Sequence, residues 1–262
     1  LMHVVLHARA ERRHARSTRD VKGELRRAGF RKEFIVANVR RLAKLVRGLG
    51  WDPGRTEWNE YGATTSYSEG DAARKDAFVR EVVHERPRRL VWDVGCNEGR
   101  HARIAAENAD YVVALDGDAG VVDRLYRSLS GEGSRTIHPL VLDVTDPSPG
   151  LGWRGAERQP LEGRGKPDLT LCLAVLHHVA LAGNIPVPAF LSWLHELGTE
   201  VVIEFPTRED PRVAALLARK RAGAHPDYDR APFERALEER FEIRRSVTLG
   251  SSNRILYSAA PR

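Results

Sequence analysis

A short apolar stretch that runs into a glycine-containing turn is the feature that most constrains this chain. Residues 90–99 read LVWDVGCNEG, a strand-like run followed by Gly95, Asn97 and Gly99. Gly95 allows a positive φ and a close approach of the backbone to a ligand, and Gly99 lets the next helix pack against the sheet. Asn97 tolerates the left-handed conformation. The pattern predicts a strand, turn and helix that bind a nucleotide-type cofactor.

The charge of this turn indicates which cofactor it binds. In the dinucleotide fingerprint the turn delivers a pyrophosphate to a helix N-terminus, where nearby carboxylates would repel the phosphates. Here Asp93 and Glu98 flank the turn. S-adenosylmethionine (SAM) carries an ammonium and a sulfonium but no phosphate, so the two carboxylates favour it over NAD. We therefore expect SAM as the cofactor.

Length and composition exclude several classes of protein. The 262 residues, 42% hydrophobic and 30% charged, are typical of a folded globular chain. Cys96 and Cys172 form neither a disulfide framework nor a metal-ligand spacing, which predicts a reducing, cytoplasmic location and no metal. No apolar run is long enough for a signal sequence or a membrane span, so we expect no membrane partner. The sequence opens on Leu1 with its single methionine at Met2, which indicates a fragment or a trimmed chain.

Positive charge is concentrated near the start of the chain. Residues 1–50 contain 14 Lys and Arg against 4 Asp and Glu, a charge of +10 in a chain whose net charge is +6. A shorter helix is expected between Ser17 and Gly29. Within residues 31–49 an apolar stripe at spacings of four and three predicts a longer helix: Ile35, Val39, Leu42, Val46 and Leu49. The basic helices are interpreted either as solvated faces or as a contact for nucleic acid.

An aromatic segment separates these helices from the rest of the chain. It includes Trp58, Tyr61 and Tyr67 among Gly, Thr and Ser residues. A ring face in this segment could cover the cofactor and hold a sulfonium, or the rings could simply pack between two parts of the protein. We expect a basic helical and aromatic appendage over residues 1–68 and the main domain over residues 69–262.

Strands and helices alternate from residue 90 onward. Near-continuous apolar strands between helices predict a parallel sheet with helices on both faces. The last two strands are joined only by Thr248 to Asn253, so they should form a hairpin with one antiparallel member. The loop from Thr145 to Pro167 is long and rich in Gly, Pro and Arg, and we expect it to contribute to a ligand site.

Two aspartates follow the second and third predicted strands. Asp116 stands 21 residues after Gly95, where a carboxylate can accept both hydroxyls of a ribose. Asp143 is placed to accept from an adenine amino group. Each aspartate can instead be a helix cap or part of a turn.

Together these motifs resemble the class I SAM-dependent methyltransferases. The resemblance rests on residues 93–99 (DVGCNEG), Asp116, Asp143 and residues 168–178 (DLTLCLAVLHH), and it covers Asp71 to Pro261. It implies an α/β, Rossmann-like fold with a seven-strand sheet in the order 3-2-1-4-5-7-6, in which strand 7 is antiparallel. Residues 58–205 are also similar to a bacterial subfamily labelled nodulation-related or ribosomal-protein methyltransferase-like.

The resemblance also implies roles for individual residues. We expect the cofactor to contact the following positions: Asp93, Gly95, Cys96, Asn97 and Gly99 at the methionine moiety, Asp116 and Gly117 at the ribose, Asp143 and Val144 at the adenine, and Leu173 and Ala174 at the methyl end. Tyr67 of the aromatic segment is a further candidate. Many members of the family have glycine where this chain has Asn97.

Three side chains are candidates for removing a proton from the methyl acceptor. His177 and His178 follow the fourth strand, and a histidine there could act as a base near neutral pH, or could cap a helix or pack below the substrate. Glu204 follows the fifth strand and is either a second base or a structural hydrogen-bonding group. Methyl transfer itself depends mainly on positioning and desolvation.

Several motifs that are absent from the sequence narrow the class of methyl acceptor. The turn after the fourth strand lacks the Asn/Asp-Pro-Pro-Tyr/Phe sequence of many amide and base-amine methyltransferases. Neither cysteine has the setting of a pyrimidine-methylating nucleophile, and no carboxylate cluster suits metal-dependent catechol methylation. We expect a small-molecule acceptor. The alternatives are an RNA or ribosomal-component acceptor held by residues 1–50, and a non-catalytic SAM-binding or interaction protein.

Overall fold

The computed structural model describes residues 32–50, 68–221, 223–250 and 253–262, together with Arg9, Asp20 and Gly23. The chain divides into two compact units, Leu1–Asp52 and Pro53–Arg262. The expected helix between Ser17 and Gly29 and the aromatic segment before Ser68 lie outside the described residues. The domain boundary after residue 68 therefore stays a prediction.

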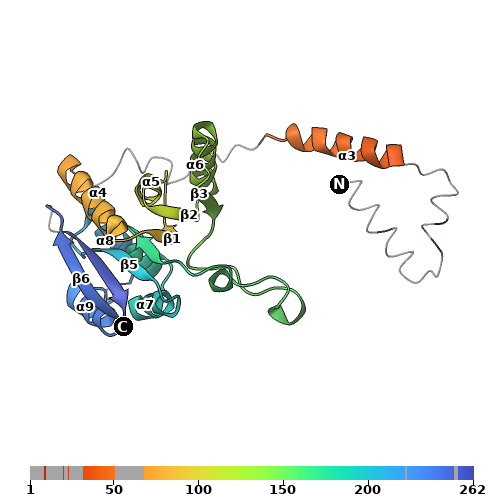
Figure 1. Ribbon diagram of the computed structural model, residues 1–262. Helices are drawn as coiled ribbons and strands as arrows, with labels where there is room; N and C mark the ends of the chain where they lie inside the picture. Colours follow the sequence, from red (N-terminus) through yellow and green to blue (C-terminus); the bar gives the residue numbers. More distant parts are fainter. Residues whose placement is uncertain are drawn as a thin grey trace. The chain divides into compact units, whose positions relative to one another are not determined.

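Seven strands of the second unit form one sheet in the order β3-β2-β1-β4-β5-β7-β6 (Figure 1). The strands are β1 (Arg88–Val94), β2 (Ala109–Asp116), β3 (Ile137–Val141), β4 (Leu169–Cys172), β5 (Glu200–Pro206), β6 (Phe241–Thr248) and β7 (Arg254–Pro261). Neighbours among β1 to β5 pair in parallel, whereas β7 is antiparallel to both β5 and β6. The predicted strand order and the antiparallel seventh strand are confirmed.

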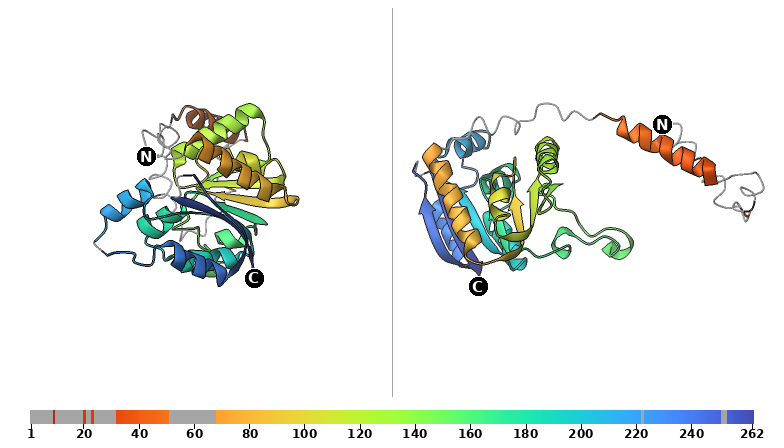
Figure 2. Two further views of the ribbon diagram at one scale, coloured as in Figure 1. Left: turned by 90° about the vertical axis from the view of Figure 1, so that its left-hand side faces the viewer. Right: turned by 45° about the horizontal axis from the view of Figure 1, so that its top comes forward.

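Helices cover both faces of this sheet, as expected (Figure 2). One face carries α4 (Glu69–His84), α5 (Arg100–Ala105) and α6 (Ala119–Glu132), and the other carries α7 (Val187–Glu196), α8 (Pro211–Ala218) and α9 (Arg230–Glu238). Successive side chains of a strand point to opposite faces. In β5, Val201 and Ile203 therefore join the core beneath α7 to α9, while Val202 joins the core beneath α4 to α6.

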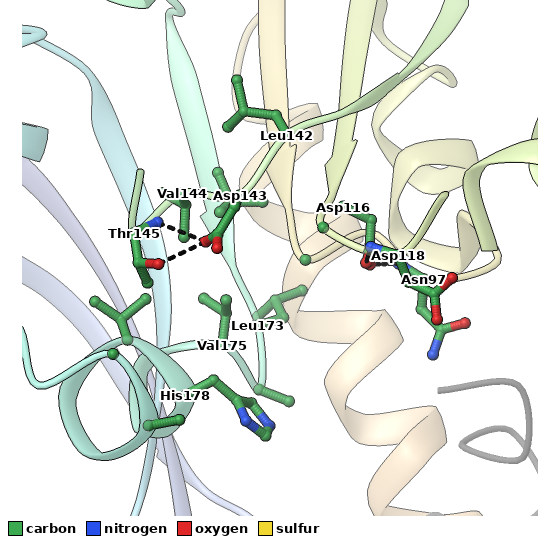
Figure 3. A pocket seen from close by; sticks show the side chains of 17 residues that line it. Asn97, Asp116, Asp118, Leu142, Asp143, Val144, Thr145, Leu173, Val175 and His178 are labelled. Carbon is green, nitrogen blue, oxygen red and sulfur yellow. Dashed lines mark hydrogen bonds between the residues drawn. The ribbon is translucent and has the colours of Figure 1, made fainter. Parts of the chain in front are cut away.

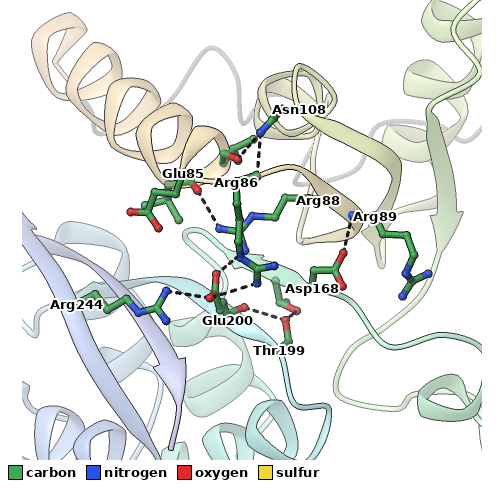
Figure 4. Close-up of polar contacts among 12 residues, drawn as sticks. Glu85, Arg86, Arg88, Arg89, Asn108, Asp168, Thr199, Glu200 and Arg244 are labelled. Carbon is green, nitrogen blue, oxygen red and sulfur yellow. Dashed lines mark hydrogen bonds and ion pairs between the residues drawn. The ribbon is translucent and has the colours of Figure 1, made fainter.

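Charged side chains hold the amino ends of the central strands together (Figure 4). The buried Arg88 of β1 donates one hydrogen bond to Glu200 of β5, at 2.5 Å, and another to the carbonyl of Val82 at the end of α4, at 3.0 Å. Arg244 of β6 also donates to Glu200, at 2.9 Å. These contacts connect three strands and a helix, and they place a structural charge cluster at the sheet end opposite to the carboxyl ends of β1 to β5.

The long loop before β4 contains short structured pieces. These are the 3-10 turns η1 (Trp153–Gly155) and η2 (Leu161–Gly163), and a bridge that pairs Leu151 with Arg158. The loop projects away from the sheet (Figure 1). Trp153, between the bridged residues Leu151 and Arg158, is exposed. Thr145, the first residue of the loop, lines the pocket described below, whereas η1 and η2 lie outside its lining. The expectation that the loop contributes to an acceptor site stays a prediction.

The first unit contains α3 (Lys32–Arg47), which matches the longer predicted helix. No helix in the described part of the chain is both long and apolar enough to cross a membrane.

Candidate active site

A pocket of about 490 Å³ opens at the carboxyl ends of β1, β2 and β4 (Figure 3). Its volume lies within the range of sites for cofactors and drug-sized ligands. It is lined by Val94, Gly95, Asn97, Asp116, Gly117, Asp118, Leu142, Asp143, Val144, Thr145, Leu173, Ala174, Val175, His178, Val179, Ala182 and Gly183. The carboxyl ends of parallel strands are the ligand-binding edge of doubly wound α/β folds.

The turn after β1 owes its shape to residues that accept a left-handed backbone. Gly95, Asn97 and Gly99 have φ values of 72°, 46° and 77°. A Cβ on Gly95 would lie 3.2 Å from Val175 Cγ2, and a Cβ on Gly99 would lie 2.6 Å from Leu125 Cδ1. The positive φ expected at Gly95 and the left-handed conformation of Asn97 are confirmed. The close approach of a ligand to Gly95 stays a prediction, and the tight contact at Gly99 is with Leu125 of α6 instead of with the sheet.

Replacing Gly99 with alanine should destabilise the domain by about 3 kcal/mol, because the left-handed φ and the collision with buried Leu125 add together. Gly133 offers a matched control, since its φ is 69° but nothing lies within 4 Å of an added Cβ. Gly133→Ala should cost only about 1 kcal/mol. Urea denaturation measures both changes, and equal losses would show that the contact with Leu125 adds nothing.

Asp116, at the end of β2, braces the turn and faces the pocket. Its Oδ2 accepts a hydrogen bond from the backbone N–H of Asn97 at 2.9 Å, and its Oδ1 accepts one from Asp118 N–H at 2.9 Å. Burial raises the pKa of Asp116, while these N–H donors act against the increase. Each carboxylate oxygen has a second lone pair. The side chain can therefore hold the turn and accept from a bound hydroxyl at the same time.

Three carboxylates give this pocket its negative field. Asp118 caps α6 by accepting from two backbone N–H groups, and Asp143 Oδ1 accepts from both the N–H and the hydroxyl of Thr145. Figure 3 shows Asp118 beside Asp116, with Asp143 farther along the cavity. Glu98, which contributed to the sequence-based charge argument, instead lies on the surface 3.7 Å from Arg124. Asp118 was missed, although it stands only two residues after Asp116.

Three predicted cofactor residues lie behind the pocket wall, outside its lining: Asp93, Cys96 and Gly99. Asp93 is 2% exposed, and burial raises its pKa to about 7 against the opposing charge of Lys75. Burial also raises the pKa of the Cys96 thiol. Tyr67, the remaining candidate, lies outside the described residues.

The turn after β4 forms the wall that holds His178. Ala174 has a left-handed φ of 56°, and the π-helical turn η3 (His178–Ala182) follows at once. Its defining hydrogen bond runs from Gly183 N–H to the His178 carbonyl, at 2.8 Å. Such π-turns often occur at functional sites. Sequence periodicity did not reveal this one, because a single turn is too short to show a repeat.

The two histidines differ sharply in their surroundings. Their ring centroids lie 4.0 Å apart, but only His178 lines the pocket, whereas His177 is fully buried. Within the described residues neither ring nitrogen of His177 has a hydrogen-bond partner, and burial lowers its pKa well below 6.5. Burial, with the positive charges of Arg212 and Arg254, lowers the pKa of His178 to about 4. Both rings are therefore neutral at pH 7, and His178 is the one that reaches the cavity.

Glu204, the third candidate base, belongs to a buried ion-pair network and does not line the pocket. Its Oε2 lies 2.6 Å from Lys75 Nζ of α4, and its Oε1 lies 3.0 Å from Arg254 of β7. Arg254 also binds Asp210, the N-cap of α8, at 2.7 Å. Glu204 is thus enclosed by two cations and lies outside the pocket lining, and this arrangement favours the structural alternative for Glu204.

Glu204→Gln is expected to lower the free energy of unfolding by about 3 kcal/mol, because two buried cations lose their shared counterion. The exposed Glu242 of β6 provides the control, and Glu242→Gln should change stability by less than about 0.5 kcal/mol. Chemical denaturation measures both variants. A Glu204 variant of unchanged stability would contradict the structural role.

The chain is similar in sequence to a protein of known name. No protein-family model matches the chain. Nodulation protein NoeA of Rhizobium meliloti (strain 1021) is 30% identical over 259 residues, which are 98% of this chain and 54% of NoeA. The chain thus spans about half the length of this curated relative.

Solved structures extend the comparison. N-methyltransferase NodS from Bradyrhizobium japonicum WM9 superimposes with a TM-score of 0.52 at 12% identity, covering 74% of this chain and 99% of NodS. The chain has the fold of the class I SAM-dependent methyltransferases. Magnesium protoporphyrin IX methyltransferase from Synechocystis PCC 6803 gives a TM-score of 0.50 at 20% identity, over 77% of this chain and 91% of that protein. S-adenosylhomocysteine is bound in that structure and in a second structure of NodS.

Most positions expected from the resemblance to methyltransferases meet in the one pocket. Those that line it are Gly95, Asn97, Asp116, Gly117, Asp143, Val144, Leu173, Ala174 and His178. They come from the turns after β1, β2, β3 and β4, which are far apart in the sequence. Among the described residues no group of three or more His, Cys, Asp and Glu side chains is arranged to hold a metal ion.

Proposed function

We propose that the protein is a SAM-dependent methyltransferase that acts on a small molecule, with His178 as the base that removes a proton from the acceptor. The observation that carries this proposal is the joint presence, in one pocket, of an acidic wall built around Asp116 and of the neutral imidazole of His178. Figure 3 shows His178 set apart from Asp116 and Asp118 within the same cavity, which leaves room for two reactants.

The lining of the pocket suits a cationic nucleoside. Asp116 would accept from the ribose hydroxyls, since its oxygens keep free lone pairs after bonding to Asn97 and Asp118. Asp143 uses Oδ1 for Thr145, which leaves Oδ2 for an adenine amino group beside Val144. The field of three carboxylates attracts an ammonium and a sulfonium and opposes a pyrophosphate. When bound, SAM supplies an electrophilic methyl group on its sulfonium.

His178 is the titratable side chain that is unprotonated and faces the cavity at the end away from Asp116. Its ring has a lone pair that can accept the proton of an attacking hydroxyl or amine, and the lowered pKa makes it a weak base. The adjacent Leu173, Val175 and Val179 are apolar and line the same cavity, which limits the access of water to the reacting groups. The buried ring of His177 packs against His178 and restricts its orientation.

Two features bear on the class of acceptor. The confined apolar wall around His178 supports a small molecule, and because NodS is an N-methyltransferase, amines are the first acceptors to test. An RNA or ribosomal component remains the second candidate, favoured by the exposed cations of α3. A non-catalytic SAM-binding role is the third.

An acceptor screen with methyl-labelled SAM tests the proposal. The purified chain is incubated with cell extract divided into metabolite, RNA and protein fractions, with Asp116→Ala as the cofactor-site control. We expect label in the metabolite fraction, and none above background with the variant. Label confined to RNA would favour the second candidate. SAM binding without labelling of any fraction would favour the non-catalytic role.

A further inference from the structure

Helix α3 carries a wide apolar face that is exposed along its whole length. None of its residues is buried. The predicted stripe contains Ile35, Val39, Leu42 and Val46 within the helix and Leu49 just after its end, with exposed fractions from 47% at Leu42 to 71% at Leu49. Phe34, Val36 and Leu45 widen the face on its flanks. Isolated exposed apolar residues are ordinary, but a contiguous face of this width indicates an interaction surface.

The rest of the helix surface is basic. The helix contains one acidic residue, Glu33, and five basic residues: Lys32, Arg40, Arg41, Lys44 and Arg47. With 3.6 residues per turn, Arg40, Arg41, Lys44 and Arg47 lie about 120° or more from the centre of the stripe, and Lys32 lies near its border. The helix therefore combines an apolar face with a polar face that carries a net charge of +4.

We propose that α3 binds the surface of an anionic lipid membrane and lies in its interface, an interaction separate from the proposed methyl transfer. This revises the expectation of no membrane partner, which concerned only signal sequences and segments that span a bilayer. An amphipathic helix with Lys and Arg on its polar face buries its apolar side among acyl chains while its cations meet anionic headgroups. Its 16 residues extend about 24 Å, which is shorter than the hydrocarbon core of a bilayer at about 30 Å. A surface position satisfies both faces, whereas a spanning position would bury five cations.

The charge and the flanks of the stripe favour lipid over a second copy of the helix. The stripe follows a heptad spacing, so self-association into a coiled coil is the main competitor. The flanking positions that would form ionic pairs across such a seam are Val36, Asn38, Ala43 and Leu45, none of which is charged. Two copies would also bring two charges of +4 together. Nucleic acid would satisfy the cations but leave the apolar face in water.

Vesicle binding by the full chain tests the proposal. Vesicles of phosphatidylcholine with about one third phosphatidylglycerol should bind the protein at least about tenfold more strongly than pure phosphatidylcholine vesicles, and added salt should weaken the binding. The double variant Leu42→Gln and Val46→Gln should reduce binding at least about tenfold, since it removes the centre of the apolar face. Glutamine maintains helix propensity. Ala37→Gln, on the polar side, is the matched control and should bind within about twofold of the parent.

The remaining outcomes would overturn the proposal. Absence of vesicle binding, or equal binding by the parent and the double variant, would exclude insertion of the apolar face. A concentration-dependent dimer in sedimentation experiments that the double variant abolishes, without vesicle binding, would assign the face to a second copy. RNA binding that depends on Arg40 and Arg47, without vesicle binding, would assign the basic side to nucleic acid. Unchanged urea denaturation of the variants is required as evidence that the domain stays folded.

Discussion

Asp116→Ala is expected to weaken SAM binding at least about 100-fold. In the proposed complex this carboxylate accepts from both ribose hydroxyls, and hydrogen bonds to a charged group contribute about 1.5–3 kcal/mol each. The variant also removes the acceptor for Asn97 N–H and Asp118 N–H, at 2.9 Å each, so the turn after β1 loses its side-chain contact with β2 and retains the backbone bonds to Leu115. Isothermal titration calorimetry with SAM measures the loss directly.

Asp123 provides the matched control for this experiment. Asp123 lies on α6, the helix that follows β2, where it pairs with Arg127 on the surface. It does not line the pocket. Asp123→Ala should leave SAM affinity within about twofold, because a surface ion pair of this kind contributes little. If Asp116→Ala bound SAM as tightly as the parent, the proposed cofactor site would be wrong.

His178→Ala should lower kcat by about 100-fold to 10,000-fold while leaving SAM affinity nearly unchanged. The reason is that His178 lines the end of the pocket away from Asp116 and, as proposed, acts on the acceptor instead of the donor. Exposed His138 on β3 offers a control of the same residue type, and His138→Ala should retain full turnover. A His178 variant with normal kcat would remove it as the base.

The pH profile gives a second, independent test of His178. The pKa of this side chain is lowered to about 4, so the imidazole is in its proton-accepting form at every pH above about 5. With an acceptor that does not titrate in this range, turnover should therefore not fall as the pH decreases from 8 through 6.5, and any loss caused by His178 should begin only as the pH approaches 4. A half-maximal rate near pH 6.5 would mean that the catalytic group has the pKa of an ordinary exposed histidine.

The local backbone requirements of the pocket could be predicted from residue types. Glycine and asparagine accept a left-handed backbone at little cost, so Gly95, Asn97 and Gly99 identify the turn after β1 before its structure is known. The strand order could also be predicted, because the motifs resemble a family with one sheet topology. The short connection between the last two strands agreed with that topology. These properties depend on neighbours in the sequence or on a pattern that covers most of the chain.

Burial and charge pairing could not be predicted in this way. Glu98 and Asp93 both flank the turn, yet the side chain of Glu98 pairs with Arg124 on the surface, and Asp93 points into the core. Glu204 follows a strand end as a catalytic carboxylate would, but Lys75 and Arg254 come from elements 129 and 50 residues away and enclose it. Of the two adjacent histidines, only His178 reaches the pocket, because core residues from distant segments cover the ring of His177.

The sequence by itself determined where the chain can form its glycine-containing turn and where a basic amphipathic helix lies, since these follow from backbone preferences and hydrophobic periodicity. The strand order was implied by the resemblance to the methyltransferase family. Only the tertiary structure decided which acidic groups face the pocket and which histidine reaches it. A side chain's access and pKa depend on desolvation and on charges brought together from distant segments, and those are properties of the packed fold.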